Sequence, residues 1–341
     1  MSSPLIGHLD ADFIKIMEEI KSMLRLVFKT ENEITFPISG TGSAGMETCF
    51  VNLVEPGDEV VIGVNGVFGM RMCDVAERCG ANVKKVEAEW GKIIEPAAIE
   101  AALKKSRPKL VAIVHAETST GALTPVEEIS RITHEAGALL LLDTVTSLGG
   151  CPVSIDEWEV DAVYSGTQKC LSCPPGLSPV SFSSKAMEVI ADRKSKVQSW
   201  YLDINFLANY WGSERTYHHT APISMNYAIH EGLQLVIDEG LENRWKRHQQ
   251  AYEKLKNGLA NLDLKITSQE GHQIWQLNAI SVPTGVDEAK IRTQLLNEFG
   301  IEIGPGLGPL KGKIWRVGLM GYNATDTNVE HFLEALGKCL V

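Results

Sequence analysis

Short apolar runs alternate with amphipathic stretches from Ile34 onward, and this alternation constrains the fold more than any other feature of the sequence. Each run has the length of a buried strand, and turn residues such as Pro56 and Gly57 separate the runs from the stretches between them. Nearly continuous apolar strands joined by helices predict a mostly parallel α/β sheet covered on both faces, because right-handed crossovers carry each helix back over the sheet. The runs that we interpret as strands are residues 34–38, 60–64, 83–86, 110–114, 139–142 and 162–164.

The two ends of the chain follow a different pattern. Asp10 is a candidate N-cap, and Met17, Ile20, Leu24 and Val27 recur behind it at helical spacing. After Pro222 the sequence is first mainly helical and then again strand-like, which is typical of a smaller α+β domain. The expected helices there are residues 225–239 and 241–260, and the expected strands are residues 277–282, 301–303 and 314–317. We place the boundary at Glu239-Gly240, with a large domain over residues 1–239 and a small domain over residues 240–341.

The composition excludes several classes of function. The 43 acidic residues outnumber the 32 basic ones, and no basic run is present that could follow a phosphate backbone, so we expect no nucleic-acid partner. No apolar stretch approaches the roughly 20 residues that cross a bilayer, and the start lacks a signal-peptide pattern, so we expect a cytoplasmic protein without a membrane partner. The seven scattered cysteines indicate reduced thiols, and the single pair Cys170 and Cys173 is too little for a zinc site, so no metal is expected.

A glycine-rich segment at residues 39–47, Ser-Gly-Thr-Gly-Ser-Ala-Gly-Met-Glu, is placed between an expected strand and an expected helix. Backbone N–H groups at the start of a helix can hold a phosphate. Such a turn is more often only a tight connection, and it lacks the lysine of a P-loop. A dinucleotide site remains open at this point.

Two charged residues follow neighbouring strands. Asp143 ends a run of leucines, where an unpaired carboxylate would be costly to bury, and Lys169 follows the next strand in a stretch of small residues. Taken singly, Asp143 would be interpreted as a turn cap and Lys169 as a surface charge. Because one strand-to-strand excursion separates them, both side chains can meet at one edge of the sheet.

With this combination the sequence resembles the class V, fold-type I aminotransferases, in particular the alanine:glyoxylate and serine:pyruvate branch. The resemblance runs nearly end to end. The segments that carry it are residues 7–9, 39–47, 65–69, 115–121, 143–150, 165–169, 217–220 and 316–321.

The resemblance implies a large domain with a mostly parallel seven-stranded sheet flanked by helices, a small C-terminal α+β domain, and pyridoxal 5'-phosphate as cofactor. Lys169 would hold the cofactor as a Schiff base and act as acid and base, and Asp143 would pair with the protonated ring nitrogen. Phe68 and Val145 would pack on the two faces of the ring, although either could be ordinary core.

The remaining implied roles concern the cofactor's oxygens and the substrate. Thr118 would bind the phenolic oxygen, and Arg316, otherwise interpreted as a surface arginine, would clamp the substrate carboxylate. The phosphate would be held by the backbone of Thr41, Gly42 and Ser43, by Gln168, and by Tyr217 and Thr220 of the neighbouring subunit of a homodimer.

This sequence departs from the family pattern at a few places. Phe68 stands where many relatives have tryptophan, and Ser43 where some have histidine. A glycine-proline-rich segment that precedes the first helix in relatives is absent from this sequence, and so is the C-terminal tripeptide of peroxisomal relatives.

The expected activity is a ping-pong transfer of an amino group from alanine or serine to glyoxylate or pyruvate, that is, between small amino acids and 2-oxo acids. One alternative is another class V reaction such as that of a cysteine desulfurase or lyase, which needs a mobile nucleophilic cysteine. Cys170 is expected to face away from the cofactor, because it follows Lys169 directly on an extended segment. A non-catalytic nucleotide-binding module is the alternative from a different class.

Overall fold

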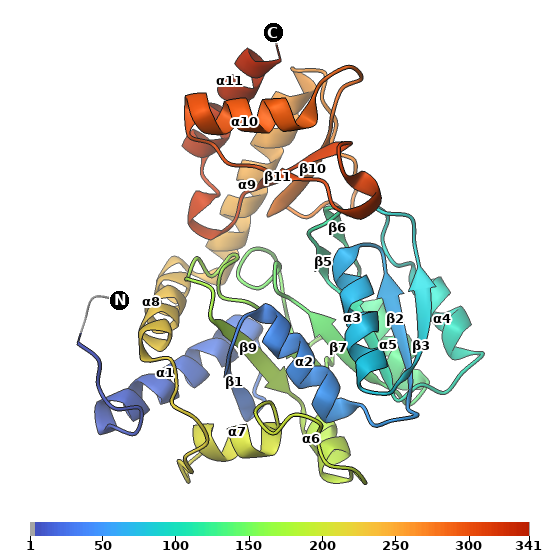
Figure 1. The fold of residues 1–341 in the computed structure, drawn as a ribbon, viewed down its shortest axis with the longest axis vertical. Coiled ribbons are helices and arrows are strands. Elements are labelled where there is room, and N and C mark those ends of the chain that lie inside the picture. The colour runs from blue at the N-terminus through green and yellow to red at the C-terminus, as the bar shows by residue number, and fades with distance from the viewer. Residues whose placement is uncertain (1–3, 341) are drawn as a thin grey trace.

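The computed structural model describes residues 4–340, and its centre is a seven-stranded sheet with helices on both faces. Figure 1 shows the sheet in the lower part of the molecule and the C-terminal elements above it. The helices are α1 (Ala11–Phe28), α2 (Gly42–Leu53), α3 (Val67–Arg78), α4 (Pro96–Leu103), α5 (Glu127–Glu135), α6 (Ser184–Ala191), α7 (Ile204–Trp211), α8 (Ile223–Glu239), α9 (Leu241–Ala260), α10 (Glu288–Phe299) and α11 (Asp326–Cys339). The strands of the central sheet are β1 (Ile34–Ser39), β2 (Glu59–Val64), β3 (Asn82–Glu87), β4 (Leu110–Val114), β7 (Leu139–Asp143), β8 (Ala162–Tyr164) and β9 (Leu177–Phe182).

The strand order is β1-β9-β8-β7-β4-β2-β3. Strands β8, β7, β4, β2 and β3 pair in parallel, whereas β9 is antiparallel to both of its neighbours. The expectation of a mostly parallel sheet of seven strands is therefore confirmed. The carboxyl ends of β1, β2, β4, β7 and β8 lie at the same edge, which places the segments after them side by side.

Successive side chains of each strand point to opposite faces of the sheet, so the apolar core of the large sheet has two parts. In β4, Ala112 packs with α2 and α3 on one face, and Val111 and Ile113 pack with α4, α5 and α8 on the other. The run Leu139–Asp143 has buried side chains throughout, because both faces of β7 are covered. This double burial explains why these strands are continuous apolar runs rather than alternating ones.

The helix expected after Asp10 is confirmed as α1, and the Asp10 carboxylate accepts a hydrogen bond from the Asp12 N–H at 2.9 Å. Every expected strand up to Tyr164 is also present. The strand β9 was missed, because Pro179 interrupts its apolar run; in the sheet this proline lies opposite Pro37 of β1.

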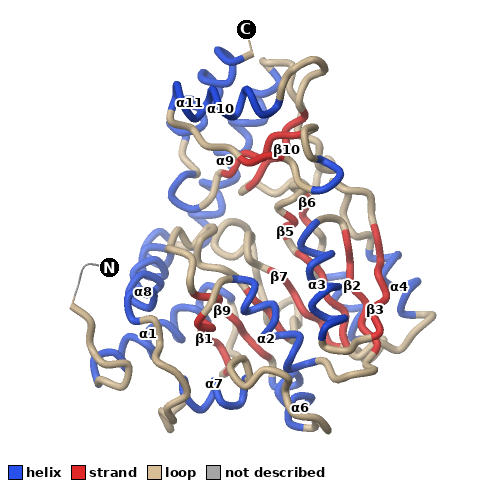
Figure 2. The backbone as a smooth tube through the Cα atoms, viewed as in Figure 1, coloured by secondary structure: helices blue, strands red, loops and turns tan. Residues whose placement is uncertain are grey.

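The C-terminal elements form a separate small sheet with its own apolar core. Its strands are β10 (Leu277–Ser281), β11 (Gly304–Pro305) and β12 (Ile314–Gly318), and Figure 2 shows them apart from the central sheet. The strand expected at residues 301–303 is wrong: Ile303 is buried in this core, but only Gly304 and Pro305 pair with β12. The apolar side chains of residues 301–303 gave a strand-like sequence pattern because they are buried, although their backbone pairs with no strand.

Helices α8 and α9 meet at Gly240, whose φ of 80° is in the region that favours glycine. Helix α8 packs on α1, and α9 packs on α11 of the C-terminal group. The domain boundary at Glu239-Gly240 stays a prediction. In residues 4–340, the helices are too short or too polar to cross a bilayer.

Candidate active site

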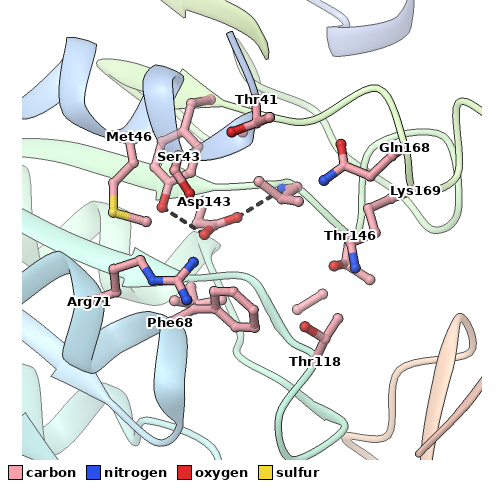
Figure 3. A pocket seen from close by; sticks show the side chains of 15 residues that line it. Thr41, Ser43, Met46, Phe68, Arg71, Thr118, Asp143, Thr146, Gln168 and Lys169 are labelled. Carbon is pink, nitrogen blue, oxygen red and sulfur yellow. Dashed lines mark hydrogen bonds between the residues drawn. The ribbon is translucent and has the colours of Figure 1, made fainter. Parts of the chain in front are cut away.

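A cavity of about 170 Å³ opens where the parallel strands end. The first residues of α2 and α3 and the segments after β4, β7 and β8 surround it. In Figure 3, Lys169 and Gln168 enter from one side, Phe68 and Arg71 from the other, and Asp143 lies between them. Nine of the expected site residues line this one cavity: Thr41, Gly42, Ser43, Phe68, Thr118, Asp143, Val145, Gln168 and Lys169.

Asp143, the last residue of β7, is a buried carboxylate with two hydrogen bonds. Its Oδ1 accepts from the Val145 N–H at 2.8 Å, and its Oδ2 accepts from the Tyr164 hydroxyl at 2.6 Å. Burial raises the pKa of Asp143 from 3.8 to about 6, although these two hydrogen bonds oppose the shift. No lysine, arginine or histidine within residues 4–340 forms an ion pair with it. The carboxylate is therefore suited to a cationic group that enters the cavity.

Lys169 follows β8 in a tight turn and is mostly removed from solvent. Burial lowers the pKa of its amine, and the nearby positive charge of Arg316 lowers it further. No hydrogen bond or ion pair joins its Nζ to the part of the chain that the structure describes. A lysine in this state reaches its neutral, nucleophilic form more easily than a surface lysine.

The amino end of α2 forms another wall of the cavity. Thr41 is the N-cap residue but its side chain makes no capping hydrogen bond to the first N–H groups of the helix, and Thr41, Gly42 and Ser43 line the cavity. An anion such as a phosphate is favoured at this position, both by those N–H groups and by the helix dipole. Gly45 lets α2 approach β9 closely, since a Cβ there would lie 2.0 Å from the Ser178 Oγ.

Phe68 lies in the first turn of α3, and a buried carboxylate holds that turn. Glu117 accepts hydrogen bonds from the N–H groups of Phe68 at 3.1 Å and Gly69 at 3.4 Å, and from the Ser119 hydroxyl at 2.6 Å. Gly66 has no room for a side chain, because a Cβ would lie 2.4 Å from the Glu117 carboxyl. These contacts fix the start of α3 and with it the backbone that carries the Phe68 ring.

Arg316, on β12 of the small sheet, reaches the edge of the site. Its Nε donates to the Pro305 carbonyl at 2.7 Å and its Nη1 to the Thr118 carbonyl at 3.2 Å. Arg316 is not among the residues that line the cavity itself. Within residues 4–340 no carboxylate forms an ion pair with Arg316, so the guanidinium is available to an anionic ligand.

The structure does not bring Tyr217 and Thr220 into this cavity. Tyr217 is 61% exposed, and Thr220 is exposed as well. Their segment, residues 212–222, joins α7 to α8.

Sequence reasoning missed several residues that matter here. Tyr164 bonds directly to Asp143, and Glu117 holds α3, but neither had been assigned a role. Met46, Arg71 and Thr146 also line the cavity. The sequence does indicate a role for Glu117, because it stands in a polar segment directly after a buried strand, where a carboxylate needs hydrogen-bond partners.

A buried arginine ties the small sheet's helices to the lysine-bearing turn. Arg244 of α9 donates to the carbonyls of Gly149 and Cys170 and to the Glu239 carboxylate, the last at 2.6 Å. Cys170 is the residue directly after Lys169. The position of the turn therefore depends on a contact from outside the large sheet.

Cysteines lie away from the cavity. The Cys170 thiol is buried and donates to the Thr146 carbonyl at 3.3 Å, and burial raises its pKa to about 12. All seven cysteines are free. Within residues 4–340 no cluster of His, Cys, Asp or Glu side chains is arranged to hold a metal ion.

The sheet, the buried carboxylate and the desolvated lysine together define an α/β enzyme of the fold-type I aminotransferase class. Comparison with known proteins agrees: the family model of class V aminotransferases matches residues 4–332. The chain belongs to this family and is an aminotransferase.

The proteins similar to this chain include animal and bacterial aminotransferases. The chain is 41% identical to alanine–glyoxylate aminotransferase of Callithrix jacchus over 340 residues, which cover 98% of this chain and 82% of the relative. A crystal structure of alanine–glyoxylate aminotransferase from Nostoc sp. is 48% identical, with a TM-score of 0.98 over 99% of this chain and 90% of that one. The ureidoglycine–glyoxylate aminotransferase of Bacillus subtilis is 41% identical, with a TM-score of 0.97 over 99% and 88% of the two chains.

Proposed function

We propose that this protein uses pyridoxal 5'-phosphate to transfer an amino group from alanine or serine to glyoxylate or pyruvate in a ping-pong reaction. The observation that carries the proposal is the shared cavity of Asp143 and Lys169, in which a buried carboxylate without a cationic partner in residues 4–340 lies near a desolvated amine. The relatives named for alanine–glyoxylate and ureidoglycine–glyoxylate transfer support glyoxylate as the acceptor.

The residues fit the cofactor group by group. The uncapped amino end of α2, at Thr41, Gly42 and Ser43, would hold the phosphate, with Gln168 beside it. Asp143 would pair with the protonated ring nitrogen, which supplies the cation that its burial demands. Bound there, pyridoxal phosphate supplies an aldehyde that carries the amino group between the two half-reactions and a ring that takes up negative charge.

The chain's own residues orient the substrate and move its proton. Lys169, whose pKa is lowered by burial, would accept the proton from the substrate Cα and later return it. Phe68 and Val145 would confine the ring between them, and Thr118 would bind its phenolic oxygen. Arg316 would hold the substrate carboxylate, since its guanidinium is positioned by the Pro305 and Thr118 carbonyls.

A homodimer is part of the proposal. Tyr217 and Thr220 are exposed, and we infer that they reach the phosphate site of a second copy of the chain. The same stretch of chain exposes large aromatic side chains, which is typical of a surface that a partner covers: Trp200, Tyr201, Phe206 and Tyr217. We also propose a cytoplasmic location, supported by the seven free thiols.

The cysteine desulfurase alternative is not favoured, because none of the residues that line the cavity is a cysteine. A steady-state assay of the cofactor-saturated enzyme tests the choice. Alanine or serine with glyoxylate is expected to give parallel double-reciprocal lines, and cysteine to release no sulfide. Sulfide release from cysteine without amino transfer to either 2-oxo acid would contradict the proposal.

A further inference from the structure

Two inward-facing histidines anchor the segment of residues 212–222 that joins α7 to α8. Tyr217 and Thr220 are exposed, whereas His218 is 7% exposed and His219 is half-buried. Because this segment forms neither a helix nor a strand, side-chain contacts rather than a backbone ladder hold it in place. The contacts of the two imidazoles therefore decide where Tyr217 and Thr220 stand.

The first of these contacts joins His219 to the strand that leads into the active site. The His219 Nε2 and the Ser39 Oγ are hydrogen-bonded at 2.6 Å. Ser39 is the last residue of β1, and residues 41–43, which follow it closely, line the active-site cavity. The Tyr201 hydroxyl donates to the Ser39 carbonyl at 3.1 Å. The start of the glycine-rich turn is thus held by His219 and by one further side chain.

The other side of the His219 ring is held as well. Its Nδ1 lies 2.8 Å from the Nδ1 of His218, whose ring stacks on Trp200 at 4.4 Å between centroids. Burial, followed by the charges of His218 and His8, lowers the pKa of His219 to about 4, so the ring is neutral at pH 7. A neutral imidazole has one donor and one acceptor nitrogen. It can therefore bond to the Ser39 hydroxyl and to His218 at the same time.

The proposed function places a phosphate at each end of this row of contacts. Residues 41–43 hold the phosphate of their own subunit, and Tyr217 and Thr220 reach the phosphate of a second copy of the chain. A ligand that orders one end of a linked structure lowers the entropy cost of ordering the other end. Such coupling is reciprocal, so either phosphate favours the other.

We propose that His219 is a positioning residue that links the two cofactor sites of the homodimer. A phosphate bound at residues 41–43 would order Ser39 and, through His219, the segment that completes the phosphate site of the second copy. The first cofactor would then favour binding of the second. This inference rests on the proposed function, because it needs both the cofactor and the homodimer.

Native mass spectrometry of the cofactor-free protein with pyridoxamine 5'-phosphate tests the proposal, because it counts dimers that hold zero, one or two cofactors. This probe carries an amine in place of the aldehyde, so it forms no Schiff base with Lys169 and reports only non-covalent binding. At half saturation the wild type should be short of singly occupied dimers. The second dissociation constant should be about fivefold smaller than the first, after correction for the two equivalent sites.

Variants assign the coupling to the bond between Ser39 and His219. Ser39→Ala removes the hydroxyl and His219→Phe removes the ring nitrogens, so each should bring the ratio of the two constants to about one, and the double variant should change it no further. The matched control is Ser199→Ala. The Ser199 hydroxyl accepts from the Leu202 N–H at 3.2 Å and has no hydrogen bond to His219, so this variant should keep the wild-type ratio.

The same spectra separate a failure of this link from a failure of the proposed function. Wild-type dimers that bind the probe at two independent sites, or Ser39→Ala dimers with the wild-type ratio, would overturn the link and leave the proposed function standing. A protein that binds no probe, or binds it as a monomer, would overturn the proposed cofactor site or the proposed homodimer, and the link with it.

Discussion

Replacing Asp143 by asparagine should have opposite effects on the protein without cofactor and the protein with it. Without cofactor, burial raises the pKa of this carboxyl from 3.8 to about 6, so the folded protein binds more protons than the unfolded chain between these values. The stability that the protonated Asp143 side chain gives the folded protein is therefore fully present below pH 3.8 and is lost as the pH rises through about 6.

The size of the effect follows from the shift. A rise from 3.8 to about 6 corresponds to about 3 kcal/mol of folding free energy at pH 8. Asparagine cannot ionise, and its oxygen can still accept from the Val145 N–H. Without cofactor, Asp143→Asn should therefore be more stable than the wild type by about 3 kcal/mol at pH 8, or about 4 °C in Tm for a chain of this size.

The assay is urea unfolding of cofactor-free protein at pH 4 and pH 8, repeated by thermal unfolding with pyridoxal phosphate. With cofactor, the variant should lose most of the stabilisation that the wild type gains, because the ring nitrogen has no carboxylate partner. Asp161→Asn is the matched control: this buried carboxylate already bonds to His134 at 2.8 Å, and its loss should destabilise the protein at both pH values. A variant at Asp143 that is less stable than the wild type at pH 8 without cofactor would refute the reasoning.

Three further substitutions test other contacts. Arg244→Met should lower Tm by about 5 °C and reduce kcat, because the carbonyls of Gly149 and Cys170 and the Glu239 carboxylate each lose a hydrogen-bond donor. A normal kcat would show that the turn that carries Lys169 does not depend on Arg244. Gly45→Ala should cost about 1–3 kcal/mol by pushing α2 off β9, measured by urea unfolding, and Ser178→Gly should restore part of the loss. Glu117→Gln should weaken cofactor binding by about tenfold in a fluorescence titration, since one amide oxygen cannot replace the carboxylate that holds α3; unchanged affinity would contradict this role.

Most of the sheet could be predicted because its strands are buried on both faces. Residues 110–114 and 139–142 have no polar side chain, and short runs of this kind with helices between them are typical of parallel strands covered on both sides. The antiparallel strand β9 could not be predicted in this way, because its partner β1 is distant in sequence and Pro179 weakens the local signal. At residues 301–303, apolar side chains indicated burial correctly but a strand wrongly.

The candidate site was predictable where the chain order itself brings residues together. Asp143 ends β7 and Lys169 follows the neighbouring strand β8, so the sheet places them at one edge. The partners Tyr164 and Glu117 depend on side-chain directions, which the sequence alone does not specify. The contact of Arg244 with the turn after Lys169 joins segments 74 residues apart, and no local pattern indicates it.

The central claim is that Lys169 holds pyridoxal phosphate and moves the proton of the substrate. The measurement that tests it most directly is the absorption spectrum of the purified protein with pyridoxal phosphate, recorded with and without alanine or serine. The wild type should show visible cofactor absorbance that bleaches with the amino acid and returns with glyoxylate, and Lys169→Ala should show neither change on the same timescale. A wild type that never acquires the visible band, or a Lys169→Ala variant that completes the cycle as fast as the wild type, would contradict the account.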